Sequence, residues 1–326
     1  MSNISQDYQS SRIISYSPAY TLVPTHECYN RCTYCNFRVE PGQSPWMTPK
    51  EAQKRLEAIS HQGVIEILIL SGEVHPASSR RQAWLDRIYD LGKLALEQGY
   101  LPHTNAGPLS FEEMAKLKEV NVSMGLMLEQ VTPRLLETVH RHAPSKLPQV
   151  RLQQLEWAGQ LKIPFTTGLL LGIGESAADW EDSLKAIALS HRRWQHIQEV
   201  ILQPHSPGSR QTWNAPSFDL QQLPAVVATA RRILPPEITL QIPPNLITRS
   251  DILLACIEAG ARDLGGIGPI DEVNPDYPHH HQIAAILAEA RWQLTERLPI
   301  YPQYDHWLSE PLQKIVSKWR QNINID

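Results

Sequence analysis

The chain has 326 residues, of which 42 % are hydrophobic, so it can bury the core of one large α/β barrel and is not intrinsically disordered. Its formal net charge is −4, from 30 basic and 34 acidic residues without a long basic run, which gives no indication of a nucleic-acid partner. The polar N-terminus lacks the apolar core of a signal peptide and no run of about 18 apolar residues occurs, so we expect a cytoplasmic protein.

Short apolar, β-rich runs alternate along the chain with longer amphipathic patterns. The runs predict eight strands, at residues 20–24, 64–70, 100–104, 121–128, 165–171, 199–203, 238–242 and 262–267. The amphipathic patterns predict helices at residues 49–62, 81–97, 150–161, 178–190, 220–234 and 250–259. Alternating strands and helices indicate βα units and a parallel sheet, and eight strands indicate an α/β protein of the (β/α)8 TIM-barrel type. A nearly full barrel with six or seven strands is the alternative.

The pattern also predicts a domain organisation. We expect residues 1–17 to form an N-terminal arm, residues 18–281 to form the barrel, and residues 282–326 to add helices that pack on it. In such barrels the active site is built from loops at the C-terminal ends of the strands. We therefore expect catalytic and cofactor-binding residues directly after the predicted strands.

Three of the four cysteines follow the first predicted strand in a C-x3-C-x2-C pattern, as Cys28, Cys32 and Cys35. Three cysteines within eight positions make a poor disulfide framework and indicate metal binding. Cysteine thiolates hold iron–sulfur clusters, which commonly take four protein ligands. Three local ligands would leave one iron open, and an open metal position is what catalysis requires.

Two non-catalytic alternatives remain for this motif. A structural zinc site could use His26 as its fourth ligand, but such sites usually pair two ligands with a second pair further along the chain. An electron carrier would need a fourth thiolate, for which Cys256 is the remaining candidate. Cys256 lies in the apolar segment DILLACIEAG, where a lone cysteine is commonly a buried small hydrophobe.

The cysteine spacing at this position resembles the radical S-adenosylmethionine (SAM) superfamily. The resemblance implies a 4Fe–4S cluster with three cysteine ligands, whose open iron is chelated by the amino and carboxylate groups of SAM. It further implies that one electron from the cluster cleaves SAM into methionine and a 5′-deoxyadenosyl radical. The aromatic residue before the last cysteine, Tyr34, is then expected at the cofactor.

Residues after later strands are further candidates for binding SAM. Gly72 and Glu73 follow the second strand and resemble the superfamily's Gly-Gly-Glu motif, with Ser71 in place of the first glycine. That resemblance implies a bond from the Glu73 carboxylate to the methionine ammonium. The glycine would permit close approach of the backbone.

The fourth and fifth strands supply the other cofactor candidates. Gly172, Gly174 and Glu175 leave the fifth strand and resemble the glycine-rich motif that lines the adenine. Glu129 follows the fourth strand and could accept hydrogen bonds from the ribose hydroxyls. Arg151 could donate a forked pair of hydrogen bonds to the methionine carboxylate.

Longer segments narrow the resemblance to one family, the small subunit of deazaflavin (FO) synthase, CofG type. They span about residues 19–278 and include LPHTNAGPLS, VSMGLMLEQ, EVILQPHSPGSRQTW, LQIPPNL and DLGGIGPIDEVNPDYP. The resemblance implies that a partner radical SAM enzyme joins tyrosine to a ribityl-diaminouracil. This chain would take that adduct, abstract a hydrogen atom, close the central ring and release ammonia, as a carbon–nitrogen lyase that also needs an electron donor.

Polar residues after the strands suit such a substrate. The candidates for catalysis are His103 and Asn105 after the third strand and Gln203 and His205 after the sixth, while Asn245 and Asn274 follow the last two. Amides both donate and accept hydrogen bonds, and histidine can move protons near neutral pH, which ring closure with loss of ammonia requires.

Related radical SAM enzymes remain as alternatives for the function. One joins tyrosine to the diaminouracil, and others act in menaquinone biosynthesis. The segments CTYCNFR, LPHTN and DLGGI favour the ring-closing subunit. The alternative from another class is a non-catalytic iron–sulfur or zinc-binding module.

Overall fold

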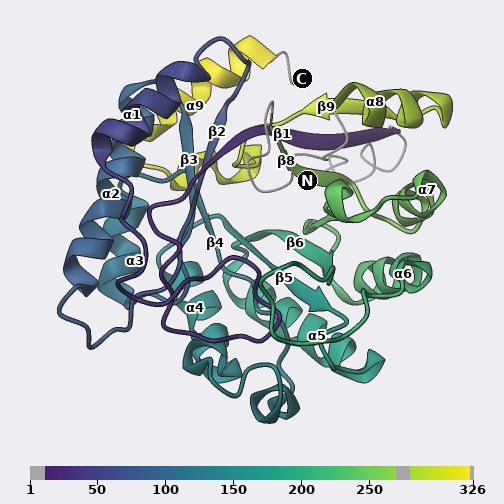
Figure 1. The fold of residues 1–326 in the computed structure, drawn as a ribbon. Coiled ribbons are helices and arrows are strands. Elements are labelled where there is room, and N and C mark those ends of the chain that lie inside the picture. The colour runs from purple at the N-terminus through teal and green to yellow at the C-terminus, as the bar shows by residue number, and fades with distance from the viewer. Residues whose placement is uncertain (1–11, 269–279, 324–326) are drawn as a thin grey trace.

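The computed structural model describes residues 12–268 and 280–323, and eight parallel strands in it form a closed barrel (Figure 1). The strands are β1 (Ile13–Leu22), β2 (Glu66–Leu70), β3 (Leu101–Asn105), β4 (Ser123–Gly125), β5 (Phe165–Leu171), β6 (Ile197–Pro204), β7 (Thr239–Gln241) and β8 (Asp263–Ile267). They are paired in chain order from β2 to β8, then to β1, and the pairing of β1 with β2 closes the ring. The predicted (β/α)8 TIM-type barrel is confirmed with its full number of strands.

Helices surround the barrel on its outside (Figure 1). They are α1 (Pro49–Ala58), α2 (Arg81–Glu97), α3 (Phe111–Lys118), α4 (Pro148–Gln160), α5 (Ala177–Trp194), α6 (Leu223–Ile233) and α7 (Ser250–Glu258), followed by α8 (His280–Glu289) and α9 (Glu310–Ile323). Short 3-10 helices lie at η2 (Pro133–Glu137), η3 (Pro144–Lys146), η4 (Leu220–Gln222), η5 (Pro244–Leu246) and η6 (Pro302–Trp307). No helix of the described ranges is long and apolar enough to cross a membrane.

The helix α3 was not predicted from the sequence, because its eight residues are short for a periodicity signal. A capping box begins it: the Ser110 side chain accepts from the Glu113 amide, and the Glu113 carboxylate accepts from the Ser110 amide. Capping boxes also begin α1 at Thr48 and α5 at Ser176. Local side-chain chemistry thus fixes where these helices leave the strand-end loops.

The first strand begins seven residues before the predicted start at Tyr20. Polar residues hid this part of β1, since Ser15 and Ser17 break the apolar pattern. They are accommodated because β1 lies between neighbours that carry polar groups, and Ser15 Oγ donates to Asp263 Oδ2 at 2.6 Å. The predicted boundary between arm and barrel at residue 17 therefore falls inside a strand, and residues 1–11 lie outside the described residues.

The chain after the barrel contains the expected helices α8 and α9 and also an unpredicted strand, β9 (Gln293–Glu296). This strand is parallel to β1, from Ile13 opposite Gln293 to Tyr16 opposite Glu296. The apolar residues that follow β9, among them Leu298 and Ile300, form a second core with Ile65, Leu101 and Val122 at the starts of β2, β3 and β4. The extension therefore covers the N-terminal end of the barrel, opposite the end where active sites form.

Candidate active site

The three clustered cysteines lie on the long loop that follows β1, and backbone bonds hold this loop in place. The Cys28 amide donates to the Val39 carbonyl at 3.1 Å, and the Cys35 amide donates to the Cys32 carbonyl at 3.1 Å. The buried carboxylate of Glu27 organises the rest of the loop, because it accepts from the Gly42 amide at 2.8 Å and from the Trp46 indole at 2.9 Å. The cysteines themselves are half-buried.

The surroundings of the three thiols fit an iron–sulfur cluster. The Phe37 amide donates to Cys35 Sγ at 3.4 Å, and Asn30 Nδ2 lies 3.7 Å from Cys28 Sγ, so amide groups already point at the sulfurs. Burial raises the pKa of the Cys28 thiol and raises that of Cys32 to about 11. Thiolates at these positions therefore need the positive charge of bound iron.

The position of Cys256 counts against the electron-carrier alternative. Among the described residues, no three His, Cys, Asp or Glu side chains converge on a position for a single metal ion. One zinc ion would need its ligands at about 2.0–2.3 Å from a common point, whereas a cluster binds thiolates at separate irons. Cys256 is fully buried on α7 within the barrel core, so it is not placed to act as a fourth ligand.

Glu73, after β2, lies at the centre of a polar network beside the cysteines. Asn30 Nδ2 donates to Glu73 Oε2 at 2.9 Å, and Arg151 Nη2 donates to Glu73 Oε1 at 3.3 Å. Gly72 must be glycine, because a Cβ there would lie 2.2 Å from the Glu27 carbonyl oxygen. Asn30 also accepts from the Ser145 amide at 3.1 Å, so it links the cysteine loop to the segment before α4.

Arg151 is buried, and its guanidinium forms most of its hydrogen bonds with nearby backbone carbonyls of the protein. It donates to the Ser145 carbonyl at 3.0 Å and to the Met127 carbonyl at 2.8 Å, besides its contact with Glu73. In this arrangement Arg151 positions Glu73 and the Ser145 segment. Its predicted fork onto a methionine carboxylate would compete with these bonds and stays a prediction.

Glu129 is paired with a lysine that the sequence analysis did not single out. Lys146 Nζ lies 2.5 Å from Glu129 Oε1, and both side chains are nearly buried. Burial would raise the pKa of Glu129, but the charges of Lys146 and Arg151 outweigh it and hold that pKa below its usual value. Glu129 has a left-handed φ of 63°, which turns its carboxylate out of the strand direction and into this network.

The glycine-rich end of β5 forms a tight turn before α5. Gly172 and Gly174 have φ values of 86° and 112°, a backbone region that other residues rarely adopt. Glu175 accepts from the Gly172 amide at 2.6 Å, from the Ile173 amide at 2.8 Å and from the Trp180 indole at 2.7 Å. Its carboxylate therefore shapes the turn, and the predicted contact with adenine stays a prediction for all three residues.

Tyr34, on the cysteine loop, contacts His205, which follows β6. Tyr34 Oη is 3.0 Å from His140 Nε2, and the Tyr34 and His205 rings meet edge to face with centroids 6.5 Å apart. The chain after β6 docks on the same loop, since the amides of Thr212 and Trp213 both donate to the Thr33 carbonyl at 2.9 Å. His205 is buried there and Nε2 lies 3.1 Å from Gln211 Oε1.

A cavity of about 230 Å³ occupies the interior of the barrel. His103 and Asn105 both line it, so the structure brings this predicted pair together. Gln203 and His205 are not among its lining residues, Asn245 does not line it either, and Asn274 lies outside the described residues. Met127 connects the cavity with the polar network, because its side chain lines the cavity and its carbonyl accepts from Arg151.

The hydrogen bonds of His103 define its tautomer. Ser123 Oγ donates to the Pro299 carbonyl at 2.6 Å, so it accepts from His103 Nδ1 at 2.7 Å and leaves Nε2 as the free acceptor. Burial, with a smaller effect from Arg297, lowers the pKa of His103 to about 3. In this arrangement His103 is a neutral hydrogen-bond acceptor, and its expected part in proton transfer stays a prediction.

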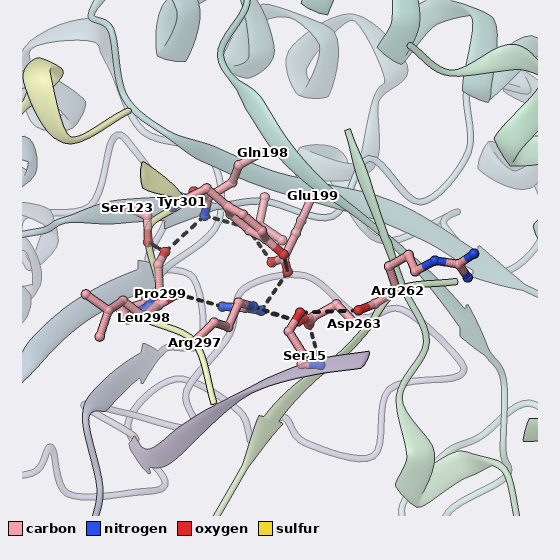
Figure 2. Close-up of polar contacts among 12 residues, drawn as sticks. Ser15, Ser123, Gln198, Glu199, Arg262, Asp263, Arg297, Leu298, Pro299 and Tyr301 are labelled. Atoms are coloured by element: carbon pink, nitrogen blue, oxygen red, sulfur yellow. Dashed lines mark hydrogen bonds and ion pairs between the residues drawn. The ribbon is translucent and has the colours of Figure 1, made fainter. Parts of the chain in front are cut away.

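Charged residues at the lower end of the cavity were missed from the sequence. Arg297 forms ion pairs of 2.6 Å with Glu199 and with Asp263, and Tyr301 Oη donates to Glu199 at 2.8 Å (Figure 2). Glu66 lines the same part of the cavity. Glu66 and Glu199, near the starts of the buried strands β2 and β6, could have been recognised from the sequence as buried charges. Nothing in the sequence connected Arg297 with the barrel.

Known proteins with similar sequences are radical SAM enzymes. The family model of the radical SAM superfamily matches residues 22–187. A 7,8-didemethyl-8-hydroxy-5-deazariboflavin synthase of Nostoc sp. is 66% identical over 313 residues, which cover 95% of this chain and 92% of that protein. The chain belongs to this family of radical SAM enzymes. The synthase of Trichodesmium erythraeum is 61% identical, with coverage of 97% of this chain and 99% of that protein.

Solved structures with low sequence identity share the fold. The hydrogenase maturase HydG of Carboxydothermus hydrogenoformans superimposes with a TM-score of 0.74 at 16% identity, covering 98% of this chain and 80% of that chain. Methylornithine synthase (PylB) gives 0.68 at 14% identity, covering 89% of this chain and 86% of that chain. Family membership makes this chain a radical SAM enzyme of deazaflavin biosynthesis with a small-molecule substrate, and it implies SAM and a 4Fe–4S cluster as cofactors.

Proposed function

We propose that this chain closes the central ring of 7,8-didemethyl-8-hydroxy-5-deazariboflavin (FO) from a tyrosine–ribityldiaminouracil adduct, with abstraction of a hydrogen atom and loss of ammonia. The observation that carries the proposal is the placement of three half-buried thiols on the loop after β1, in a barrel with an interior cavity and a chain 66% identical to an FO synthase. The reaction makes the chain a carbon–nitrogen lyase. It takes place in the cytoplasm, with an electron donor and with the adduct supplied by a partner radical SAM enzyme.

When bound, the cluster and SAM supply a 5′-deoxyadenosyl radical that takes a hydrogen atom from the substrate. Cys28, Cys32 and Cys35 would hold three irons and leave the fourth for SAM. The carboxylate of Glu73 would accept hydrogen bonds from the methionine ammonium, while Asn30 and Arg151 keep it in position. Four further residues would line the cofactor: Tyr34, Glu129, Gly172 and Gly174.

The chain's own part in the reaction is to orient the substrate and exclude water. His103 Nε2 accepts a hydrogen bond from the substrate, because the neutral imidazole has its proton on Nδ1. The half-buried amide of Asn105, two residues further along β3, both donates and accepts. Enclosure within the barrel protects a radical intermediate from solvent.

An anaerobic assay with two proteins tests this proposal. The reconstituted chain is incubated with dithionite, SAM, the partner enzyme, tyrosine and 5-amino-6-ribitylaminouracil, and the products are separated by chromatography. The proposal predicts fluorescent FO only when both proteins are present, and more 5′-deoxyadenosine from the two proteins together than from the partner enzyme alone. Adduct formation by this chain alone would assign it to the tyrosine-joining step instead.

A further inference from the structure

The cavity in the barrel has a floor of charged residues that the proposed chemistry does not use. Its lining side chains lie two residues apart along the strands, as Glu66 and Leu68 on β2 and as Glu199 and Ile201 on β6. The first residue of each pair lies nearer the N-terminal ends of these parallel strands, about 7 Å below the second. Glu66 and Glu199 therefore form the floor, and Arg297 from the chain after β9 completes it.

The floor offers more hydrogen-bond acceptors than its own donors use. Arg297 directs Nε at Asp263 and Nη2 at both Asp263 and Glu199, and Nη1 donates to the Leu298 carbonyl at 3.0 Å (Figure 2). Glu199 Oε2 has a long contact of 3.3 Å with Thr166 Oγ1. Glu66 is 8% exposed and forms no ion pair among the described residues, and Ser17 and Arg297 are the neighbours that favour its charged form.

Glycines keep this space open. The interior of a TIM barrel is normally filled by layers of branched side chains. Here Gly125 and Gly265 line the cavity, and a Cβ would lie 2.8 Å from His103 Nε2 at the first and 2.2 Å from Gln241 Nε2 at the second. The absence of side chains at these positions leaves the polar groups of His103 and Gln241 facing an open interior.

The mixture of groups indicates what the lower cavity binds. The carboxyl groups of the floor accept hydrogen bonds, and Thr166, paired with Glu199, can both donate and accept. One layer above, His103 Nε2 accepts, and Gln241 can both donate and accept. An ammonium group only donates, and the apolar residues that a planar ring system needs, such as Leu68 and Ile201, lie above the floor. Hydroxyl groups do both, so a chain of hydroxyls matches these walls. The volume of about 230 Å³ is below the roughly 300–1,000 Å³ of sites that hold a whole ligand, so only part of the adduct enters.

We propose that the floor of the cavity binds the hydroxyl groups of the substrate's ribityl chain, with the carboxylates of Glu66 and Glu199 as acceptors. The inference rests on the proposed function, which supplies the ribityl group. The chain then anchors the adduct in the barrel and keeps the reacting rings at the upper end, where Met127 joins the cavity to the cofactor network. Glu66 and Glu199 act as specificity-determining residues and take no part in the chemistry.

Binding measurements test this without turnover. Isothermal titration calorimetry on the protein reconstituted with cluster and SAM compares 5-amino-6-ribitylaminouracil with 5-amino-6-methylaminouracil, which lacks the hydroxyls. The wild type should bind the ribityl compound at least about tenfold more tightly, as expected for several hydrogen bonds to buried carboxyl groups. Glu66→Gln should lose most of this preference and leave binding of the methyl compound unchanged.

Two further variants keep the test decisive. Glu199→Gln should have the same effect as Glu66→Gln, and Glu156→Gln, whose carboxylate bonds Ser190 and Trp194 outside the cavity, should retain the preference. Equal affinity of the wild type for both compounds, or an equal loss for both in the folded variants, would overturn the inference. Because FO formation by the wild type is assayed separately, failure of the proposed function would show itself independently.

Discussion

At the scale of single residues, the four cysteines divide by their surroundings. Cys28, Cys32 and Cys35 are half-buried on one loop beside polar side chains, whereas Cys256 is fully buried in the apolar core. The first three can reach a cluster. The last contributes packing alone.

Alanine variants separate the two groups. Cys28→Ala, Cys32→Ala or Cys35→Ala should each lose the bound cluster and all formation of 5′-deoxyadenosine. Cys256→Ala should keep both and lower the free energy of unfolding by about 1 kcal/mol, through a small cavity. Iron and sulfide per chain are measured after anaerobic reconstitution. A folded Cys256→Ala protein without iron would contradict the three-ligand assignment.

Buried histidines make stability depend on pH. Burial lowers the pKa of His196 from 6.5 to about 3. Below about pH 6.5 the unfolded chain takes up this proton first, so stability falls as the pH falls from 6.5 towards 3, and the loss at pH 5 is about 2 kcal/mol from this group. In urea unfolding at pH 7 and pH 5, His196→Leu should show a pH effect smaller by about that amount. An unchanged pH effect would mean that His196 is solvated when folded.

At the scale of helices and strands, the sequence predicted every barrel strand but not every boundary. Alternating apolar runs identified the buried strands, and the hydrogen-bonded loop of cysteines was readable because its residues are local in sequence. The start of β1 and the whole of β9 were missed, because their hydrogen bonds come from partners more than 240 residues away. The same applies to the cavity floor, which brings together Glu66, Glu199 and Arg297 from three distant segments.

The turn between β5 and α5 gives a test at this scale. Glu175→Ala removes the acceptor for two backbone amides and an indole, so it should lower the free energy of unfolding by about 2 kcal/mol and weaken SAM binding through a disordered turn. Urea unfolding and SAM titration measure the two effects. A variant as stable as the wild type that no longer binds SAM would show instead that Glu175 contacts the cofactor directly.

At the scale of the whole molecule, the C-terminal extension closes one end of the barrel and the cysteine loop lies at the other. Arg297 is the link between extension and barrel, because it neutralises Glu199 and Asp263 on two strands (Figure 2). Burial raises the pKa of Glu199 to about 8, and the guanidinium opposes that rise. The extension therefore supplies a residue, Arg297, that lines the cavity inside the barrel.

Removal of the guanidinium should expose this dependence. Arg297→Met leaves buried carboxylates without their cation, so the free energy of unfolding should fall by about 3–5 kcal/mol. Adding Glu199→Gln to that variant should restore part of the loss. Urea unfolding of the single and double variants gives both numbers, and a single variant as stable as the wild type would mean that the carboxyls are already protonated.

Ring closure of a preformed adduct can be measured without the enzyme that makes the adduct. The adduct is made by the partner enzyme, purified away from it, and given anaerobically to the reconstituted chain with SAM and dithionite. We predict FO, ammonia and 5′-deoxyadenosine without any partner enzyme present, and no FO from the Cys32→Ala variant. Failure of a protein with a full cluster to convert the purified adduct, while it cleaves SAM, would contradict the account.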